Sequence, residues 1–168
     1  KYLEDYEVMT QSSFMNAITM LQQGNLEFAN TNIERCIDIC IKTENWYELE
    51  AAYHLGVHIN KAMGIYDKSI NYSKLGMALT KENKNDTYPF QRHYFTLIDS
   101  YFEKGDFEST IKTIDSYFKE TELLIAKDVN ENNDNYTEHF PNTFNCYKIF
   151  SLARLGKNYS QREFSKFI

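Results

Sequence analysis

Residues 64–66 read Gly64-Ile65-Tyr66, a glycine, a spacer and a bulky apolar side chain, and the same order occurs at Gly24-Asn25-Leu26 and at Gly105-Asp106-Phe107. The three glycines are spaced 40 and then 41 residues apart. Recurrence at one interval indicates that a single supersecondary unit is stacked several times, because such a unit cannot bury its apolar face without a neighbour. The sequence therefore predicts an array of repeats.

Apolar side chains recur at spacings of three and four residues on both sides of each glycine, which is the pattern of amphipathic helices. Phe14, Ala17, Ile18 and Leu21 form one such stripe before Gly24. We predict a single domain of helix pairs, with repeat 1 at about 8–43, repeat 2 at about 46–82, repeat 3 at about 89–126 and a degenerate repeat 4 at about 141–168. An acidic, Asn-rich loop at 128–140 separates the last two repeats.

Polar residues that can cap helices stand where these helices should begin. Asn25 and Asp106 directly follow a turn glycine, and Asn45 with Glu48 three residues later has the spacing of a capping box. Trp46 stands at a predicted helix start, and we expect it to pack between repeats.

Composition limits the class of protein. The chain has 168 residues, 42% of them apolar, and a net charge of −6, so it can bury a core and would be repelled by nucleic acid. Three cysteines and no secretory signal predict a reducing, cytoplasmic location, and no apolar run is long enough to cross a membrane. We expect the chain to be a piece of a longer protein.

Two segments of repeat 2, Ala52-Tyr53-His54-Leu55-Gly56 and Gly64-Ile65-Tyr66-Asp67-Lys68-Ser69-Ile70, resemble the tetratricopeptide-repeat family. Ala29 in repeat 1 and Thr110 in repeat 3 occupy the family's small-residue position, with threonine replacing alanine in the latter. The resemblance implies an all-α, right-handed superhelix of antiparallel helix pairs with about 3–4 repeats. It also implies a non-enzymatic module that binds a peptide or protein segment in its concave groove.

Steric reasons support these residue types. Small residues such as Gly56 and Ala29 let helix axes approach closely, while Leu26, Tyr66 and Phe107 fill the gap between one pair and the next.

The period near 40 and the aromatic-rich helices also resemble the Rap and PlcR group of intracellular peptide-pheromone receptors of Gram-positive bacteria. This resemblance implies the sensor domain of a peptide-responsive regulator, with a role in signalling and transcription regulation. The alternative from another class is a structural scaffold or homo-oligomerisation domain, such as a homodimer, whose groove holds no ligand.

By the family's pattern, the first helix of each pair lines the groove. Carried over residue by residue, the resemblance implies these peptide-binding residues: Phe14, Ile18, His54, His58, Lys61, Arg92, Phe95, Asp99 and Phe102.

Two other patterns suggest metal ions, and we predict a site for neither. His54 and His58 are four residues apart, as are Cys36 and Cys40, which is a zinc-ligand spacing. The repeat phase, however, directs the cysteines into the core and the histidines into the groove. The loop from Asp128 departs from a calcium-binding loop because Asn133 and His139 replace its required glycine and glutamate. No catalytic motif and no cofactor motif is present.

Overall fold

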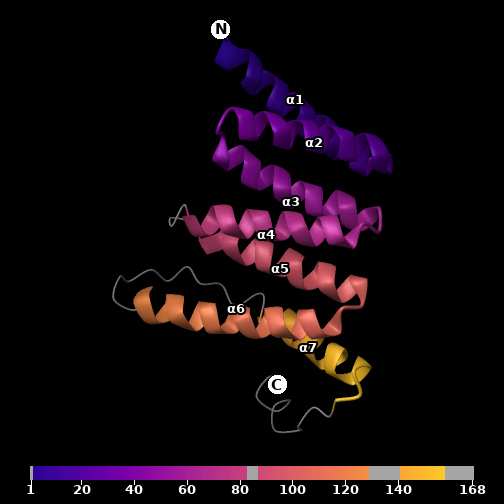
Figure 1. The fold of residues 1–168 in the computed structure, drawn as a ribbon, viewed down its shortest axis with the longest axis vertical. Coiled ribbons are helices and arrows are strands. Elements are labelled where there is room, and N and C mark those ends of the chain that lie inside the picture. The colour runs from indigo at the N-terminus through magenta and orange to yellow at the C-terminus, as the bar shows by residue number, and fades with distance from the viewer. Residues whose placement is uncertain (1, 83–86, 129–140, 158–168) are drawn as a thin grey trace. The chain divides into compact units, whose positions relative to one another are not determined.

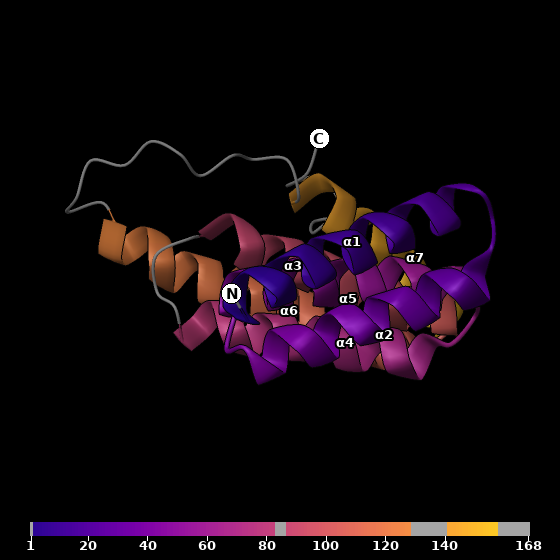
Figure 2. The ribbon, with the colours of Figure 1, turned by 90° about the horizontal axis from the view of Figure 1, so that it is seen from above.

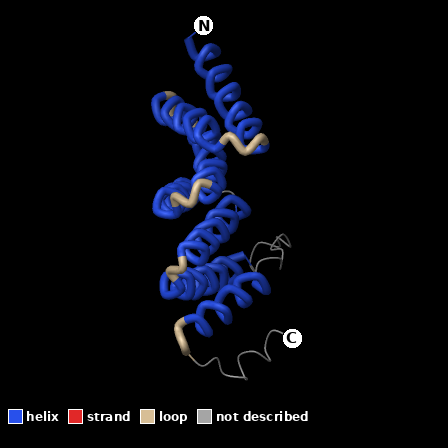
Figure 3. Tube along the Cα trace, turned by 90° about the vertical axis from the view of Figure 1, so that its right-hand side faces the viewer, coloured by secondary structure: helices blue, strands red, loops and turns tan. Residues whose placement is uncertain are grey.

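The structure is a computed structural model, and it describes residues 2–82, 87–128 and 141–157. Within these ranges the chain forms seven helices and no strand (Figures 1 and 3): α1 (Tyr2–Gln22), α2 (Leu26–Lys42), α3 (Trp46–Ala62), α4 (Tyr66–Glu82), α5 (Thr87–Lys104), α6 (Phe107–Asp128) and α7 (Pro141–Arg154). The prediction of an all-α helical array is confirmed. Most of the predicted loop at 128–140 and the last eleven residues of predicted repeat 4 lie outside the described residues. None of the described helices combines the length and apolar character that crossing a bilayer requires.

The chain divides into two compact units, Lys1–Ser100 and Tyr101–Ile168. In unit 1, α1, α2, α3 and α4 follow one another, and the chain reverses direction at the end of each helix (Figure 1). α1 packs against α2 and α3, and α3 packs against α2 and α4. Figure 2 shows α1 and α3 on one side of this stack and α2 and α4 on the other. Unit 1 therefore has two layers, one of which contains the first helix of each pair.

One type of turn ends most of these helices. After α1, the Gly24 N–H donates to the Leu21 carbonyl at 3.0 Å and the Asn25 N–H donates to the Met20 carbonyl at 2.9 Å. This bond pattern needs a residue with positive φ, which glycine adopts without steric cost. Among the residues that the structure describes, those with positive φ are Gly24, Glu44, Gly64, Gly105 and Gly156, which end α1, α2, α3, α5 and α7. Glu44, with φ of 54°, therefore stands in a turn that the glycine pattern did not reveal.

The side-chain caps were predicted correctly at two of three helix starts. The Glu48 N–H donates to Asn45 Oδ1 at 3.3 Å, which confirms Asn45 as the cap of α3; in return, Glu48 Oε2 accepts from the Asn45 side-chain amide at 3.0 Å, not from its backbone N–H as in a capping box. Asp106 caps α6 by accepting from the Ser109 N–H at 3.1 Å. The prediction for Asn25 was wrong, because its side chain makes no cap hydrogen bond. Phe28 stands at the position that Glu48 occupies after Asn45, so no carboxylate holds the Asn25 amide in place.

Asn45 and Asn25 thus form a matched pair for mutation. We expect Asn45→Ala to lower the free energy of unfolding of unit 1 by about 1 kcal/mol, because the substitution removes the cap of α3. Asn25→Ala should lower the free energy of unfolding by less than about 0.5 kcal/mol, since the Asn25 side chain makes no cap hydrogen bond that the substitution could remove. Urea denaturation followed by the fluorescence of Trp46, the single tryptophan, measures both. Equal losses for the two variants would contradict this account of the caps.

The core of unit 1 contains small, branched and tyrosine side chains from α1, α2, α3 and α4. Its buried members include Ala17, Ala29, Ile33, Cys36, Ile37, Cys40, Leu49, Ala52, Tyr53, Val57, Ile59 and Tyr72. A Cβ added at Gly56 would lie 2.8 Å from the Tyr72 ring, which confirms that a small residue here lets α3 and α4 approach.

The prediction that Trp46 packs between repeats was wrong. It is 45% exposed, because it is the first residue of α3 and precedes the buried stripe that begins at Leu49.

Small polar residues join α4 to the unit-1 part of α5. Ser69 and Ser100 share a hydrogen bond of 2.6 Å, and Ser73 and Thr96 share one of 3.0 Å. One turn farther along α4, Gly76 lies against the ring of His93. These pairs follow one antiparallel register, so hydroxyl groups and a glycine take part in the contact between the two helices.

In unit 2, α6 packs against α7. Phe144 of α7 is fully buried, and its ring meets Tyr117 of α6 edge to face with 4.7 Å between centroids. Phe107, predicted to fill a gap between helices, is half-buried and lies in an aromatic cluster with Phe102 and Phe150. Phe144 is therefore the more deeply buried anchor of this unit.

Candidate functional site

The first helices of unit 1 share one face. On α3, Tyr47, Ala51, His54, His58 and Lys61 recur at spacings of three and four residues and so lie along one side of the helix. Arg92, Phe95 and Asp99 have the same spacing on α5, and Phe14 and Ile18 are one turn apart on α1. We call these ten residues the α1–α3–α5 face.

A buried carboxylate joins α3 to α5 beside this face. Arg92 Nη2 lies 2.6 and 2.5 Å from the two carboxylate oxygens of Glu50, and His93 Nε2 donates to Glu50 Oε1 at 2.5 Å. Burial would raise the pKa of Glu50, but the hydrogen bonds from His93 and Arg92 outweigh it and hold the pKa below its usual value. Glu50 is therefore a charged anchor between the two helices.

A second connection lies toward the other end of α3. Lys61 pairs with Asp99 of α5, and both side chains are largely buried. Between the two connections, His54 and His58 are joined through their Nε2 atoms at 3.3 Å, and the His54 ring lies edge to face with His93 at 5.9 Å. We call this continuous row the α3–α5 seam; it consists of Glu50, His54, His58, Lys61, Arg92, His93 and Asp99.

The two seam histidines on α3 resist protonation. Burial, reinforced by the positive charge of Arg92 and by His58, lowers the pKa of His54 to about 3. Partial desolvation and the neighbouring Lys61 also lower the pKa of His58, although this residue is more exposed than His54. Both rings are consequently neutral near pH 7, which fits the Nε2 to Nε2 contact, because one ring donates and the other accepts.

This predicts a stability loss in mild acid. An unfolded histidine binds a proton near its ordinary pKa of about 6.5, whereas folded His54 does not, so stability is complete above that pH and is lost as the pH falls toward 3. We expect unit 1 to lose about 2 kcal/mol from this residue between roughly pH 7 and pH 5. Urea denaturation across this range should show a clearly shallower pH dependence in His54→Asn. An unchanged slope in the variant would show that His54 is not the group responsible.

The structure brings five of the nine predicted peptide-binding residues together. His54, His58, Lys61, Arg92 and Asp99 all belong to the α3–α5 seam. They contact one another or Glu50, so these side chains hold α3 and α5 together whether or not a ligand is bound. Their role in binding stays a prediction.

The other four predicted residues lie elsewhere. Phe14 and Ile18 are half-buried on α1, and Phe95 is half-buried on α5. Phe102 belongs to unit 2, where its ring centroid lies 4.6 Å from that of Tyr147. Phe102 thus contributes to an aromatic cluster of unit 2.

A pocket opens between α1 and α3 at one end of the α1–α3–α5 face. Its volume is about 210 Å³, and its lining residues are Thr10, Gln11, Phe14, Cys36, Tyr47, Glu48 and Ala51. Tyr47 is 86% exposed, whereas Cys36 of α2 is fully buried and forms part of the lining. The volume is below the roughly 300–1,000 Å³ of typical small-molecule sites. The pocket therefore suits a side chain better than a whole cofactor.

Sequence reasoning missed Glu50, His93 and Tyr47. A signal for the first two was present, because Glu50 is 42 residues from Arg92 and 43 residues from His93, close to the repeat period of 40. Residues one period apart on successive first helices should lie opposite each other. No spacing in the sequence identified Tyr47 as a pocket residue, since the exposure of an aromatic side chain near a helix end depends on how the neighbouring helices pack.

Of the two patterns that suggested metal ions, the structure describes the cysteine and histidine pairs but not the loop after Asp128. Cys36 and Cys40 are fully buried in the core, as predicted. Within the described ranges, no three His, Cys, Asp or Glu side chains gather as metal ligands would. The loop that resembles a calcium site lies outside those ranges beyond Asp128.

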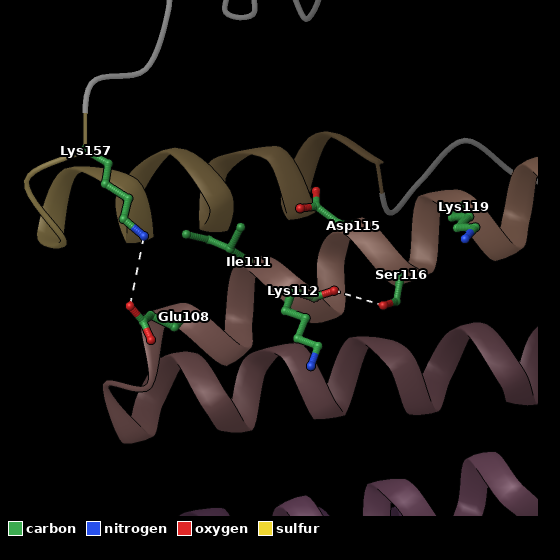
Figure 4. A pocket seen from close by; sticks show the side chains of 7 residues that line it. All are labelled: Glu108, Ile111, Lys112, Asp115, Ser116, Lys119 and Lys157. Carbon is green, nitrogen blue, oxygen red and sulfur yellow. Dashed lines mark hydrogen bonds and ion pairs between the residues drawn. The ribbon is translucent and has the colours of Figure 1, made fainter.

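Unit 2 has its own open pocket of about 400 Å³ along α6 (Figure 4), lined by Glu108, Ile111, Lys112, Asp115, Ser116, Lys119 and Lys157. Its charges partly pair. Figure 4 shows Lys157 facing Glu108, with Nζ 4.0 Å from the carboxylate, and Lys148 Nζ lies 2.5 Å from Asp115 Oδ1. With mixed charges and a single apolar side chain, this pocket indicates no ligand class.

Comparison with known proteins addresses the fold. The chain is similar to the TPR domain of Arabidopsis FLU, known from a crystal structure, with a TM-score of 0.62. The match covers 70% of this chain and 98% of that domain, and 22% of the aligned residues are identical. The chain has the fold of a tetratricopeptide-repeat domain. No protein-family model matches the sequence, and no curated protein does.

This tetratricopeptide-repeat fold accounts for the layering of unit 1. α1, α3 and α5 correspond to the first helices of successive pairs, and α2 and α4 correspond to second helices. At this level of identity the similarity concerns the fold alone, so the function has to be argued from the α1–α3–α5 face and its pocket.

Proposed function

We propose that unit 1 is a binding module for a polypeptide segment, which it holds on the α1–α3–α5 face. The observation that carries this proposal is the pocket between Phe14 and Tyr47, which opens at the end of that face. One apolar side chain of the ligand enters the pocket, and the adjoining residues of the ligand run along α3.

The size of the pocket supports a ligand that extends beyond it. Burying one apolar side chain contributes about 1.5–3 kcal/mol, whereas a dissociation constant of about 1 μM requires about 8 kcal/mol. The remaining free energy has to come from further contacts on the face. A polypeptide can supply these contacts, because its successive side chains reach α3 and α5 beyond the pocket.

A more specific role follows from the resemblance to the Rap and PlcR group. We propose that the module is the sensing part of a peptide-responsive regulator in the cytoplasm. The support is the repeat period and the aromatic-rich helices.

Selection from a random peptide library displayed on phage tests the binding proposal. We expect the chain to enrich peptides that bind with micromolar dissociation constants, measured by fluorescence anisotropy. Ala51→Leu places a larger side chain in the pocket and should weaken these peptides at least about tenfold, which is about 1.4 kcal/mol.

The matched control is Ala78→Leu, the same substitution at an exposed position of α4. It should leave the affinity unchanged. Failure to enrich any peptide, or peptides that bind Ala51→Leu as tightly as the parent, would overturn the proposed function.

A further inference from the structure

Two of the three helices that line the pocket, α1 and α3, supply carboxylates near it but no cation that is free to pair with them. α1 contributes Glu7, whose carboxylate acts on Glu48, and has no Lys or Arg, while α3 contributes Glu48 and Glu50. The single lysine of α3, Lys61, is engaged by Asp99. The surface between α1 and α3 therefore has an excess of negative charge.

The neighbouring charges are already compensated or neutral. Glu50 is neutralised by Arg92, as the α3–α5 seam shows. His54 and His58 have lowered pKa values and remain uncharged near pH 7. Glu48 is thus the carboxylate of α3 that still faces the pocket without a cationic partner from α1 or α3.

Glu48 is held in an unfavourable environment. Burial raises the pKa of its carboxyl, and the Glu7 carboxylate raises that pKa further. Within unit 1, the Asn45 amide donates to Glu48 Oε2, but this neutral group supplies no positive charge. A cation brought by a ligand would compensate both effects.

Tyr47 adds a surface on which a cation can stack. Its ring is 86% exposed, lines the pocket and precedes Glu48 directly in the chain. Arg or Lys side chains gain about 0.5–1 kcal/mol from contact with the face of an exposed aromatic ring. Arg can also form charge-assisted hydrogen bonds with a carboxylate at the same time.

We propose that the segment bound by unit 1 is basic, with an apolar side chain that enters the pocket and an adjacent Arg or Lys that pairs with Glu48 and stacks on Tyr47. This inference rests on the proposed function and specifies the ligand of the same site. Its basis is charge complementarity with Glu48, which lines the mostly apolar pocket, and with the nearby Glu7 carboxylate.

The test uses the full chain and three matched pools of degenerate peptides. Each pool has Leu or Phe at its centre. The flanking positions are Arg and Lys in the first pool, Asp and Glu in the second, and Ser and Gln in the third. Immobilised protein captures the peptides, which are quantified by mass spectrometry. We expect at least about tenfold greater capture of the basic pool than of the acidic pool at low salt, and a smaller ratio at high salt.

A variant without the Glu48 charge tests whether this carboxylate causes the preference for basic peptides. Glu48→Gln keeps a side chain that can accept from Asn45 and should reduce capture of the basic pool about tenfold. The control Glu27→Gln makes the same change in net charge at an exposed position near the start of α2, away from the pocket lining, and should leave capture unchanged.

The possible results distinguish a failure of the basic-ligand inference from a failure of the proposed peptide-binding function. Preference for the basic pool that Glu48→Gln abolishes supports the inference. Capture of the acidic or neutral pool to the same extent, or a basic preference that both variants retain, overturns the inference and leaves the proposed function standing. Capture of no pool overturns both.

Discussion

Phe144→Ala should lower the free energy of unfolding of unit 2 by about 3–5 kcal/mol, the largest loss that we expect from any single substitution in the chain. Phe144 is fully buried, and its ring meets Tyr117 edge to face. Truncation removes this contact and leaves a cavity between α6 and α7 that the surrounding side chains cannot fill. Because small domains are stable by only about 5–15 kcal/mol, much of the stability of unit 2 is then lost. Guanidinium denaturation followed by far-ultraviolet circular dichroism measures the change.

Phe150→Ala is the matched control, since it makes the same substitution on the same helix. Phe150 is 51% exposed, so its truncation should cost about 1 kcal/mol or less. If the two variants unfold at the same denaturant concentration, the packing assigned to α6 and α7 is wrong.

Gly76→Ala should destabilise unit 1 by about 2–3 kcal/mol, even though alanine favours a helix by up to about 1 kcal/mol over glycine. The added Cβ would overlap Cε1 and Nε2 of the His93 ring. The His93 ring cannot move away easily, because it is fully buried and donates to Glu50. The substitution therefore separates α4 from α5 and disturbs the α3–α5 seam. Urea denaturation monitored by Trp46 fluorescence reports the loss.

Two further variants test whether the clash with His93 causes the loss of stability in Gly76→Ala. Gly56→Ala places its Cβ 2.8 Å from the Tyr72 ring, a milder contact, and should cost less than Gly76→Ala. In a His93→Ala background, Gly76→Ala should be neutral or stabilising, because the ring is gone and the gain in helix propensity remains. A full loss of stability in that background would contradict the clash with His93.

The fold was largely predictable from the sequence because its signals are local. Gly24, Gly64 and Gly105 mark turns that require positive φ, and Asn45 with Glu48 marks a helix start through residues three positions apart. The turn at Glu44 was not predictable in this way. A glutamate gives no indication of positive φ, whereas the structure shows the same hydrogen bonds here as in the glycine turns, with the Asn45 N–H donating to the Cys40 carbonyl at 2.9 Å.

The candidate site was predictable only in part, because it depends on contacts between distant residues. The resemblance named Arg92, Lys61 and Asp99, but it did not name Glu50, the partner of Arg92, and it did not pair Lys61 with Asp99 one repeat away. That pairing requires the register between α3 and α5, which the period of 40 approximates within two residues. The pocket could not be predicted at all, since a hollow depends on how the side chains of three helices pack.

The seam and the pocket have different physical roles. The α3–α5 seam contains charges that compensate one another across two helices, so it fixes the position of α3 against α5. The pocket between α1 and α3 combines an apolar lining with Glu48, whose charge neither of these helices compensates. Ligand recognition is therefore expected at the pocket, and the seam provides the rigid surface beside it.

The central claim is that unit 1 binds a polypeptide segment on the α1–α3–α5 face with one side chain in the pocket. Amide NMR of the 19.9 kDa chain, titrated with the peptide most enriched from the random library, tests this claim most directly. The account predicts that the largest shift changes fall on the pocket residues Gln11, Phe14, Tyr47, Glu48 and Ala51 and continue along α3. Shift changes centred on the α6 pocket of unit 2 or on the outer side of α2, with the α1 and α3 amides unmoved, would contradict it.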